Sequence, residues 1–283
     1  MSEPKLISPL LDGFVMGPSM SAHPGVRSCP AMPQDSDKRY IVKIISIPAS
    51  AEQLEALLLT GAFATQESAL AYFKDQAQRT IEEIGVLKKL SSLEGFVPFE
   101  AYQLVDKQNE PGYELYILSP YKTSLEQQLN RHTMTHLNAV NLGLDLCASL
   151  AVCRRAGYLY VNLKPENVFM SEDKEFRIGD LGFVSMDSLK YTSLDERYHS
   201  PYSAPECSNV FETLNTTVDT YAAGMILYQT YNDGFLPSPE DGDQLPPPQY
   251  ADYEMAEIIM KAIDPNPANR WQDPNAMGQA IVT

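Results

Sequence analysis

The sequence predicts an α+β protein of two lobes: a β-rich first half that contains one long helix, and a mainly helical second half. Up to about residue 121, short runs rich in β-branched residues alternate with turn residues. After residue 121, apolar residues recur mostly at helical spacing. No internal repeat is evident, and we expect one two-lobed domain with its lobes at 1–121 and 122–283.

The first half is expected to hold five strands, at 10–16, 26–32, 40–47, 99–105 and 113–118. A short helix is expected near 50–61, because Ser50 and Gln53 form a capping-box pattern and Gly61 is a typical helix-ending residue. A longer helix is expected at 66–90, where apolar residues lie three or four apart.

The second half is expected to be helical apart from short strand-and-loop pieces. Helices are predicted at 124–129 and 137–156, and again from 218 onward. Strand-and-loop pieces are expected at 158–170 and 175–178, and a proline-rich loop at 237–248 interrupts the last helices.

Composition excludes several classes of function. Hydrophobic residues make up 44% of the chain, and 21 basic against 37 acidic residues give a net charge of −16. A chain this acidic does not hold nucleic acid or anionic lipid by bulk electrostatics, and we expect no nucleic-acid partner. Four cysteines without a CxxC pair indicate free thiols in a reducing compartment. We find neither a signal-peptide pattern nor an apolar stretch long enough for a membrane segment, and we expect a cytoplasmic protein.

Five short motifs, in a fixed order, carry the chemistry. They are Tyr40-Ile-Val-Lys43, a helical segment that contains Glu83, Tyr160-Val-Asn-Leu-Lys-Pro-Glu-Asn-Val-Phe-Met170, Ile178-Gly-Asp-Leu-Gly182 and Ala204-Pro-Glu206. In that order they resemble V-A-I-K, the helix whose Glu pairs with its Lys, H-R-D-L-K-P-E-N, D-F-G and A-P-E of protein kinases. Asp219 and Arg270 match two further structural residues of that family. The set is similar to the bacterial, eukaryotic-like Ser/Thr protein kinases, and the resemblance implies a two-lobed protein kinase-like fold.

The resemblance also implies residues that would bind ATP and Mg²⁺. Lys43 would hold the α- and β-phosphates, Glu83 would hold Lys43, and Lys164 would touch the γ-phosphate. Asn167 and Asp180 would bind magnesium through hard oxygen atoms. The adenine surroundings implied by the resemblance are Val26 at the end of the phosphate loop, Ile41 and Phe169 as walls, Leu118 as gatekeeper, and Ser119, Pro120 and Tyr121 as hinge.

The positions that handle the substrate proton depart from the family pattern. Asn162 replaces the Asp that orients or accepts the proton of the substrate hydroxyl, and a carboxamide is not a base at neutral pH. Losing a general base typically costs about 10²–10⁴ in rate. Tyr160 and Val161 replace the His and Arg of the family loop, and His199 takes the place of a substrate-positioning Thr.

The nucleotide surroundings depart as well. No G-x-G-x-x-G is present; Gly17 and Gly25 bracket a segment with two prolines, which lack the N–H groups that approach phosphate. Ile41 stands where the family has Ala, and overpacking of this size typically costs about 1–3 kcal/mol. Ile41 and Phe169 either fill the adenine space as core, or adopt rotamers that leave room for a ligand.

Because the structural residues persist while the chemical ones are altered, the sequence indicates a pseudokinase that works as a binding or regulatory module for a protein partner. One alternative is a slow but active Ser/Thr protein kinase that uses Asn162 in place of the usual Asp. A second is a sensor that binds ATP without transferring phosphate. The helix at 50–61 lengthens the segment between Lys43 and Glu83, and is a candidate partner-binding element.

Overall fold

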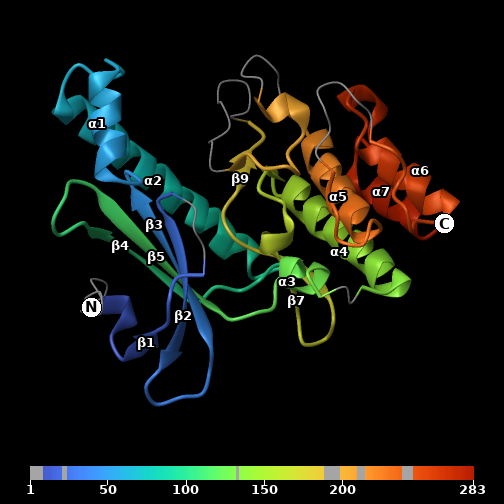
Figure 1. Cartoon of the computed structure of the whole chain (residues 1–283), viewed down its shortest axis with the longest axis horizontal. Helices are drawn as coiled ribbons and strands as arrows, with labels where there is room; N and C mark the ends of the chain where they lie inside the picture. The colour runs from blue at the N-terminus through green and yellow to red at the C-terminus, as the bar shows by residue number, and fades with distance from the viewer. Residues whose placement is uncertain (1–8, 21–23, 132–133, 188–197, 209–213, 238–244) are drawn as a thin grey trace. The chain divides into compact units, whose positions relative to one another are not determined.

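The computed structural model describes residues 9–20, 24–131, 134–187, 198–208, 214–237 and 245–283 (Figure 1). The chain divides into two compact units, the first made of residues 1–88 and 98–121 and the second of residues 89–97 and 122–283. Residues 89–97, placed in the first lobe by sequence, therefore group with the second unit. The first unit is built on a sheet and the second is mainly helical, so the α+β expectation is confirmed.

A five-stranded antiparallel sheet forms the first unit, in the order β1-β2-β3-β5-β4. Its strands are β1 (Phe14–Met16), β2 (Val26–Pro33), β3 (Tyr40–Ile47), β4 (Ala101–Asp106) and β5 (Tyr113–Pro120). The expectation that the first strand begins at residue 10 was wrong. Leu10 and Leu11 belong to the 3₁₀ turn η1 (Pro9–Leu11), which buries Leu11 against the sheet.

The central strand β3 is covered on both faces. Val42 and Ile44 pack on one face in an apolar cluster, while Ile45 and Ile47 are buried on the other. Because side chains alternate along a strand, Lys43 lies on the same face as Ile45. The strand thereby fixes the direction of Lys43 through its apolar neighbours.

Two helices connect β3 to β4, namely α1 (Ala51–Leu59) and α2 (Gln66–Leu90). Ser50 caps α1, since its hydroxyl accepts a hydrogen bond from the N–H of Gln53 at 3.4 Å. The reciprocal half of the expected capping box differs, because the Gln53 side chain accepts from the N–H of Ala49 rather than from that of Ser50. Gly61, at φ +74°, follows the helix as expected.

The second unit surrounds one long helix. Its helices are α3 (Leu125–Leu129), α4 (His136–Arg155), α5 (Thr217–Thr230), α6 (Tyr253–Ala262) and α7 (Pro274–Ile281). Its short strands are β6 (Tyr158–Tyr160), β7 (Val168–Met170), β8 (Phe176–Ile178) and β9 (Phe183–Ser185), with 3₁₀ turns η2 (Pro165–Asn167), η4 (Pro205–Ser208) and η5 (Pro267–Asn269). Strand β9, which pairs with β6, was missed in the sequence because three residues carry no readable alternation.

Helix α4 is, among the described residues, the one helix long and apolar enough to cross a membrane by length and composition. Half of that apolar stretch is buried inside the protein, where α4 packs against α5 and α7. A core helix meets the same criteria, so length and composition carry no further conclusion.

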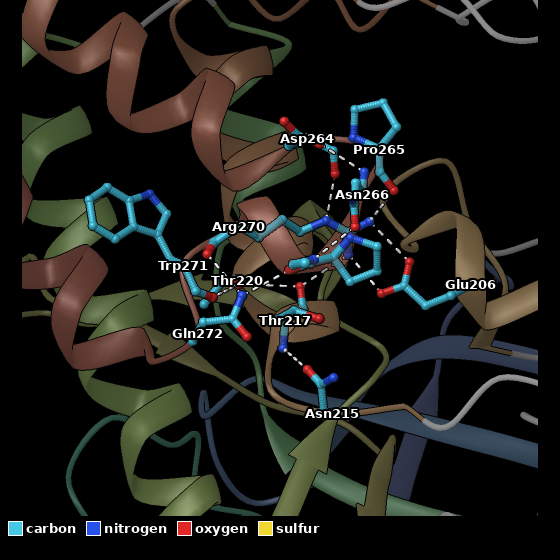
Figure 2. A network of polar contacts seen from close by, with 12 residues as sticks. Glu206, Asn215, Thr217, Thr220, Asp264, Pro265, Asn266, Arg270, Trp271 and Gln272 are labelled. Atoms are coloured by element: carbon cyan, nitrogen blue, oxygen red, sulfur yellow. Dashed lines mark hydrogen bonds and ion pairs between the residues drawn. The ribbon is translucent and has the colours of Figure 1, made fainter.

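A buried ion pair joins the helices of the second unit. The guanidinium of Arg270 forms two hydrogen bonds to the Glu206 carboxylate, at 2.7 and 3.0 Å. Figure 2 shows the same guanidinium donating to the carbonyl oxygens of Asp264 and Pro265, at 2.6 and 3.1 Å. The charged group also lies 4.7 Å from the ring of Tyr221. Since both charges are buried and joined by two short hydrogen bonds, this pair holds η4 against the chain before α7.

Thr216, the N-cap of α5, and Thr220 within α5 add hydrogen bonds to the residues that follow Arg270. Thr220 donates to the carbonyl oxygen of Trp271 at 2.9 Å, and Thr216 donates to that of Gln272 at 2.7 Å (Figure 2 labels Thr220, Trp271 and Gln272). The segment that carries Arg270 is therefore fixed from two sides.

Arg270→Ala should lower the free energy of unfolding by about 3–5 kcal/mol, because it leaves the Glu206 carboxylate buried without a counter-ion. The matched control is Arg79→Ala, which breaks the exposed pair with Asp75 and should cost no more than about 1 kcal/mol. Urea unfolding of both variants measures the difference. Equal losses would show that the buried pair has no special structural role.

Candidate functional site

The loop that resembles H-R-D-L-K-P-E-N begins at a buried anchor. The backbone N–H of Tyr160 donates to both carboxylate oxygens of Asp219, at 3.1 and 3.3 Å. The Tyr160 ring packs 4.9 Å from that of Phe183, and its hydroxyl donates to the carbonyl oxygen of Gly179. Tyr160 is fully buried. It therefore acts as core and as a support for the segment that contains Asp180.

Asn162, at the position of the expected proton acceptor, is turned onto the chain itself. Its side-chain nitrogen donates to the carbonyl oxygen of Leu181 at 2.7 Å. The residue is 6% exposed, and its side-chain oxygen is buried with no hydrogen-bond partner in the described structure. The amide orientation follows from the Leu181 carbonyl, which can accept a hydrogen bond but cannot donate one. In this arrangement the oxygen that would meet a substrate hydroxyl does not reach the surface.

Gly182 makes this close contact possible. Its φ is +136°, and a Cβ at this position would collide with the Cβ of Asn162. Its carbonyl oxygen accepts a hydrogen bond from the N–H of Val161 at 2.9 Å. Hydrogen bonds from Val161 and from the Asn162 side chain thus join the loop to the D-F-G-like segment.

Asn167 and Asp180, the predicted magnesium ligands, each have a side-chain oxygen atom of the kind that binds Mg²⁺. The Asn167 side-chain nitrogen donates to the backbone oxygen of Asn162 at 2.9 Å, which leaves the amide oxygen as the acceptor atom of that side chain. Asp180 has φ +76°, in a region that non-glycine residues seldom adopt and that typically costs about 1–3 kcal/mol. One Asp180 oxygen accepts the N–H of Leu181 at 2.8 Å. Oxygen donors of this kind fit the preference of Mg²⁺.

Lys164 begins the turn η2 in an extended conformation, and its carbonyl oxygen accepts the N–H of Asn167 at 2.9 Å. Its side chain is half-buried. In the first unit, Lys43 on β3 and Glu83 on α2 are also half-buried, and both take part in polar or electrostatic interactions. These three charged residues keep the elements that the family pattern assigns to them.

The structure contradicts the expected gatekeeper. Paired residues of neighbouring strands share a face of the sheet, and Lys43 is opposite Ile117, while Ile41 is opposite Ser119. Leu118 is opposite Val42 and packs in the cluster on the other face. Leu118 therefore cannot line the space beside Lys43; Ile117 and Ser119 do. The one-residue error arose because alternation alone cannot fix the register between two strands.

The strand register also decides which side chain lies opposite Ile41, the residue expected to crowd the adenine position. Ile41 is larger than the alanine of the family pattern, but the residue opposite it on the same face is the small Ser119. This face of the sheet therefore places one large and one small side chain opposite each other. Tyr121, expected in the hinge, is 36% exposed, and its backbone N–H donates to the carbonyl oxygen of Arg39 at 2.9 Å.

In the second unit, the ring of Phe169, the expected floor residue, packs beside Gly179. A Cβ at Gly179 would lie 3.2 Å from the Phe169 ring and 3.1 Å from the Val97 side chain. The absence of a side chain at Gly179 therefore leaves room for the ring and for Val97. Phe169 is half-buried and acts as part of the packing of this unit.

The sequence predicts that the segment between Gly17 and Gly25 departs from a phosphate-binding loop, and two of its described residues are bonded to β2. The N–H groups of Gly17 and Met20 already donate to the carbonyl oxygens of Pro30 and Ser28, at 2.8 and 2.7 Å. A Cβ at Gly17 would lie 2.7 Å from the Pro30 ring, so this glycine makes room for Pro30. Residues 21–23 of the loop lie outside the described residues. The N–H groups of Gly17 and Met20 are therefore committed to the sheet, in contrast to those of a loop that cradles phosphate.

Gly25, at the other end of the loop, packs closely against the chain after β3. A Cβ at Gly25 would collide with Ala49, and the carbonyl oxygen of Gly25 accepts the N–H of Ser46 at 2.7 Å. Val26 follows on β2, opposite Ile45 and on the Lys43 face. The residue directly opposite Lys43 is Ser28, which the sequence did not single out.

Two serines form hydrogen bonds within residues 198–203, which precede the Ala204-Pro-Glu206 motif. The Ser203 hydroxyl donates to the carbonyl oxygen of Tyr198 at 3.1 Å and accepts the N–H of Ser200 at 3.0 Å. His199 is exposed. The segment leads directly into η4, which contains Glu206.

Comparison with known proteins shows where the chain is similar. The family model for the protein kinase domain matches residues 62–279. A probable serine/threonine-protein kinase of Clostridium perfringens is 25% identical over 47% of this chain and 22% of its own length. The serine/threonine-protein kinase PknG of Mycolicibacterium smegmatis is 28% identical over 64% of this chain and 24% of its own, and that of Mycobacterium leprae 28% identical over 49% and 18%. The matched part is thus about a quarter or less of these relatives.

The anchor under the loop should make stability depend on pH. Burial raises the pKa of Asp219 to about 7, against the N–H of Tyr160, which lowers it. Between about pH 4 and pH 7 the folded chain holds a proton that the unfolded chain releases, so the free energy of unfolding falls as pH rises through this interval. The contribution amounts to at most about 4 kcal/mol and is fully present below pH 4.

Asp219→Asn removes this titration. Subtracting the pH dependence of the variant's stability from that of the wild type removes the contribution of the other titratable groups. We expect the wild-type midpoint of thermal unfolding, relative to that of the variant, to fall from pH 4 to pH 8. A difference that is constant with pH would contradict the assignment.

Proposed function

The chain belongs to the protein kinase family, and from this premise we propose that it is a pseudokinase that serves as a binding or regulatory module for a protein partner. Its phosphoryl-transfer chemistry is impaired and its binding of nucleotide is weak or absent. The observation that carries the proposal is the orientation of Asn162.

Asn162 supports the loss of catalysis in two ways. An amide cannot act as a base at neutral pH, and here its nitrogen is engaged with Leu181 while its oxygen is buried. The side chain thus works as a link between the loop and the D-F-G-like segment. A residue engaged in this way stabilises the fold without touching a substrate.

The hydrogen bonds of the phosphate loop support the inference that nucleotide binding is weak or absent. Backbone N–H groups are the phosphate ligands that a glycine-rich loop supplies, and those of Gly17 and Met20 are bonded within the sheet. When bound, magnesium would supply neutralisation of phosphate charge, and Asn167 and Asp180 are the residues that would hold it.

Asn167 and Asp180 also favour the two alternative functions, a slow kinase and an ATP sensor. Asn167 keeps an acceptor oxygen, and Asp180 keeps a strained conformation of the kind that persists where the surrounding structure requires it. The relatives are named serine/threonine-protein kinases, which is consistent with descent from an active enzyme. A cytoplasmic location, absence of a membrane segment and absence of nucleic-acid binding remain part of the proposal.

Asn162→Asp separates the proposal from the slow kinase. An aspartate cannot donate to the Leu181 carbonyl oxygen and would place a negative oxygen against it, so we expect no gain of phosphate transfer and a loss of about 1–3 kcal/mol in stability. Transfer from radiolabelled ATP to a generic protein substrate, together with thermal unfolding, measures both effects.

The control is Asn162→Ala, which loses the same hydrogen bond without adding a charge. It should unfold at a higher temperature than the aspartate variant. Transfer that appears with Asn162→Asp and not with Asn162→Ala would refute the pseudokinase and show that only the base is missing.

A further inference from the structure

A cavity in the second unit lies apart from the loop that contains Asn162. It has a volume of about 240 Å³ and lies where α4 begins and α5 ends. Its lining consists of Met134, Thr135, His136, Ala139, Thr230, Tyr231, Asp233 and Tyr250. None of the motifs that resemble kinase sequences contributes a residue to it.

Aromatic rings form much of this cavity. Tyr231 is 4% exposed, and its hydroxyl shares a hydrogen bond with the His136 ring at 3.2 Å. The two rings meet edge to face at 5.8 Å. Tyr250 is 60% exposed and is positioned by its backbone, whose N–H donates to the Tyr231 carbonyl oxygen at 2.9 Å. One ring is therefore fixed deep in the cavity and another stands at its opening.

The charge around the cavity is negative. Asp233 lines it, is exposed, and has φ +54°; no lysine or arginine is among its described lining residues. The Asp252 carboxylate lies 3.9 Å from His136, and together with burial it raises the pKa of Tyr231 to about 12. The carboxyl end of α5 also favours a cation. Aromatic faces combined with carboxylates attract ammonium and guanidinium groups.

We propose that this cavity receives an arginine or lysine side chain from a basic segment of a protein partner. The occupant follows from charge complementarity. The chain carries a net charge of −16, the lining adds one carboxylate (Asp233) and an exposed tyrosine (Tyr250), and Asp252 lies beside the lining residue His136. The proposal gives the partner inferred above a chemical class, and rests on that function only in requiring a protein partner.

The test is a titration of the full chain with a dye-labelled nonapeptide of alternating arginine and glycine, followed by fluorescence anisotropy. A lysine version and a glutamine version of equal length are the comparisons. We expect both basic peptides to bind and the glutamine peptide not to bind. Asp233→Asn and Tyr250→Ala should each weaken binding by about threefold or more. Asparagine tolerates the left-handed backbone at 233, and alanine keeps the backbone hydrogen bond at 250.

Matched controls exclude general attraction to an acidic protein. Glu257→Gln removes the same charge from α6, and Tyr253→Ala removes a tyrosine that is 73% exposed, both outside the cavity lining. Both should bind the basic peptides as the wild type does. Equal weakening by cavity and control variants, or no weakening by either cavity variant, would overturn the proposal.

Light scattering tests the other occupant, a second copy of the chain. A dimer that Tyr250→Ala dissociates would also overturn the proposal. The titration contains no ATP, so a positive transfer assay with Asn162→Asp would refute the pseudokinase and leave the cavity proposal intact. Thermal unfolding of each variant confirms that it is folded.

Discussion

The rest of the site depends on the buried carboxylate of Asp219. It accepts the N–H of Tyr160 and fixes the start of the loop that leads to Asn162, Lys164 and Asn167. Burying this carboxylate, which accepts hydrogen bonds from the backbone N–H of Tyr160, is costly, which is why its pKa rises. The buried ion pair of Arg270 and Glu206 is a second fixed point of the same unit. Between them, the positions of the loop residues are set by packing and hydrogen bonds that need no ligand.

On this fixed frame, the exchange of one side chain changes what the loop can do. The Asn162 amide donates to the Leu181 carbonyl oxygen, a bond that an aspartate cannot make, and Gly182 leaves the space for that contact. Asparagine at position 162 therefore both removes the base and supplies a structural hydrogen bond. Asn167 and Asp180, which lie on the same frame, keep oxygen atoms suited to a cation. The fold of the loop can be kept while the catalytic base is lost, because the fold depends on Asp219 and the base on the side chain at position 162.

Much of this could be predicted from the sequence, because strong local patterns specify it. The bounds of β3 and α2 follow from β-branched residues and from helical spacing, and the family motifs identify Asp219, Glu206 and Arg270. Other features could not be predicted, since they depend on contacts between distant segments. The strand register decides that Ser119 rather than Leu118 shares a face with Ile41. The carbonyl of Leu181 decides the orientation of Asn162. The hydrogen bonds of Gly17 and Met20 depend on how the hairpin closes.

The central claim of the proposal is that the chain binds nucleotide weakly or not at all. The most direct measurement is thermal unfolding of the wild-type chain with and without millimolar ATP and Mg²⁺. A ligand present at about 100 times its dissociation constant adds about 2.7 kcal/mol, which raises the midpoint by several degrees in a domain of this size. The account predicts no magnesium-dependent shift. A magnesium-dependent rise of several degrees would contradict it and favour an ATP sensor or a slow kinase.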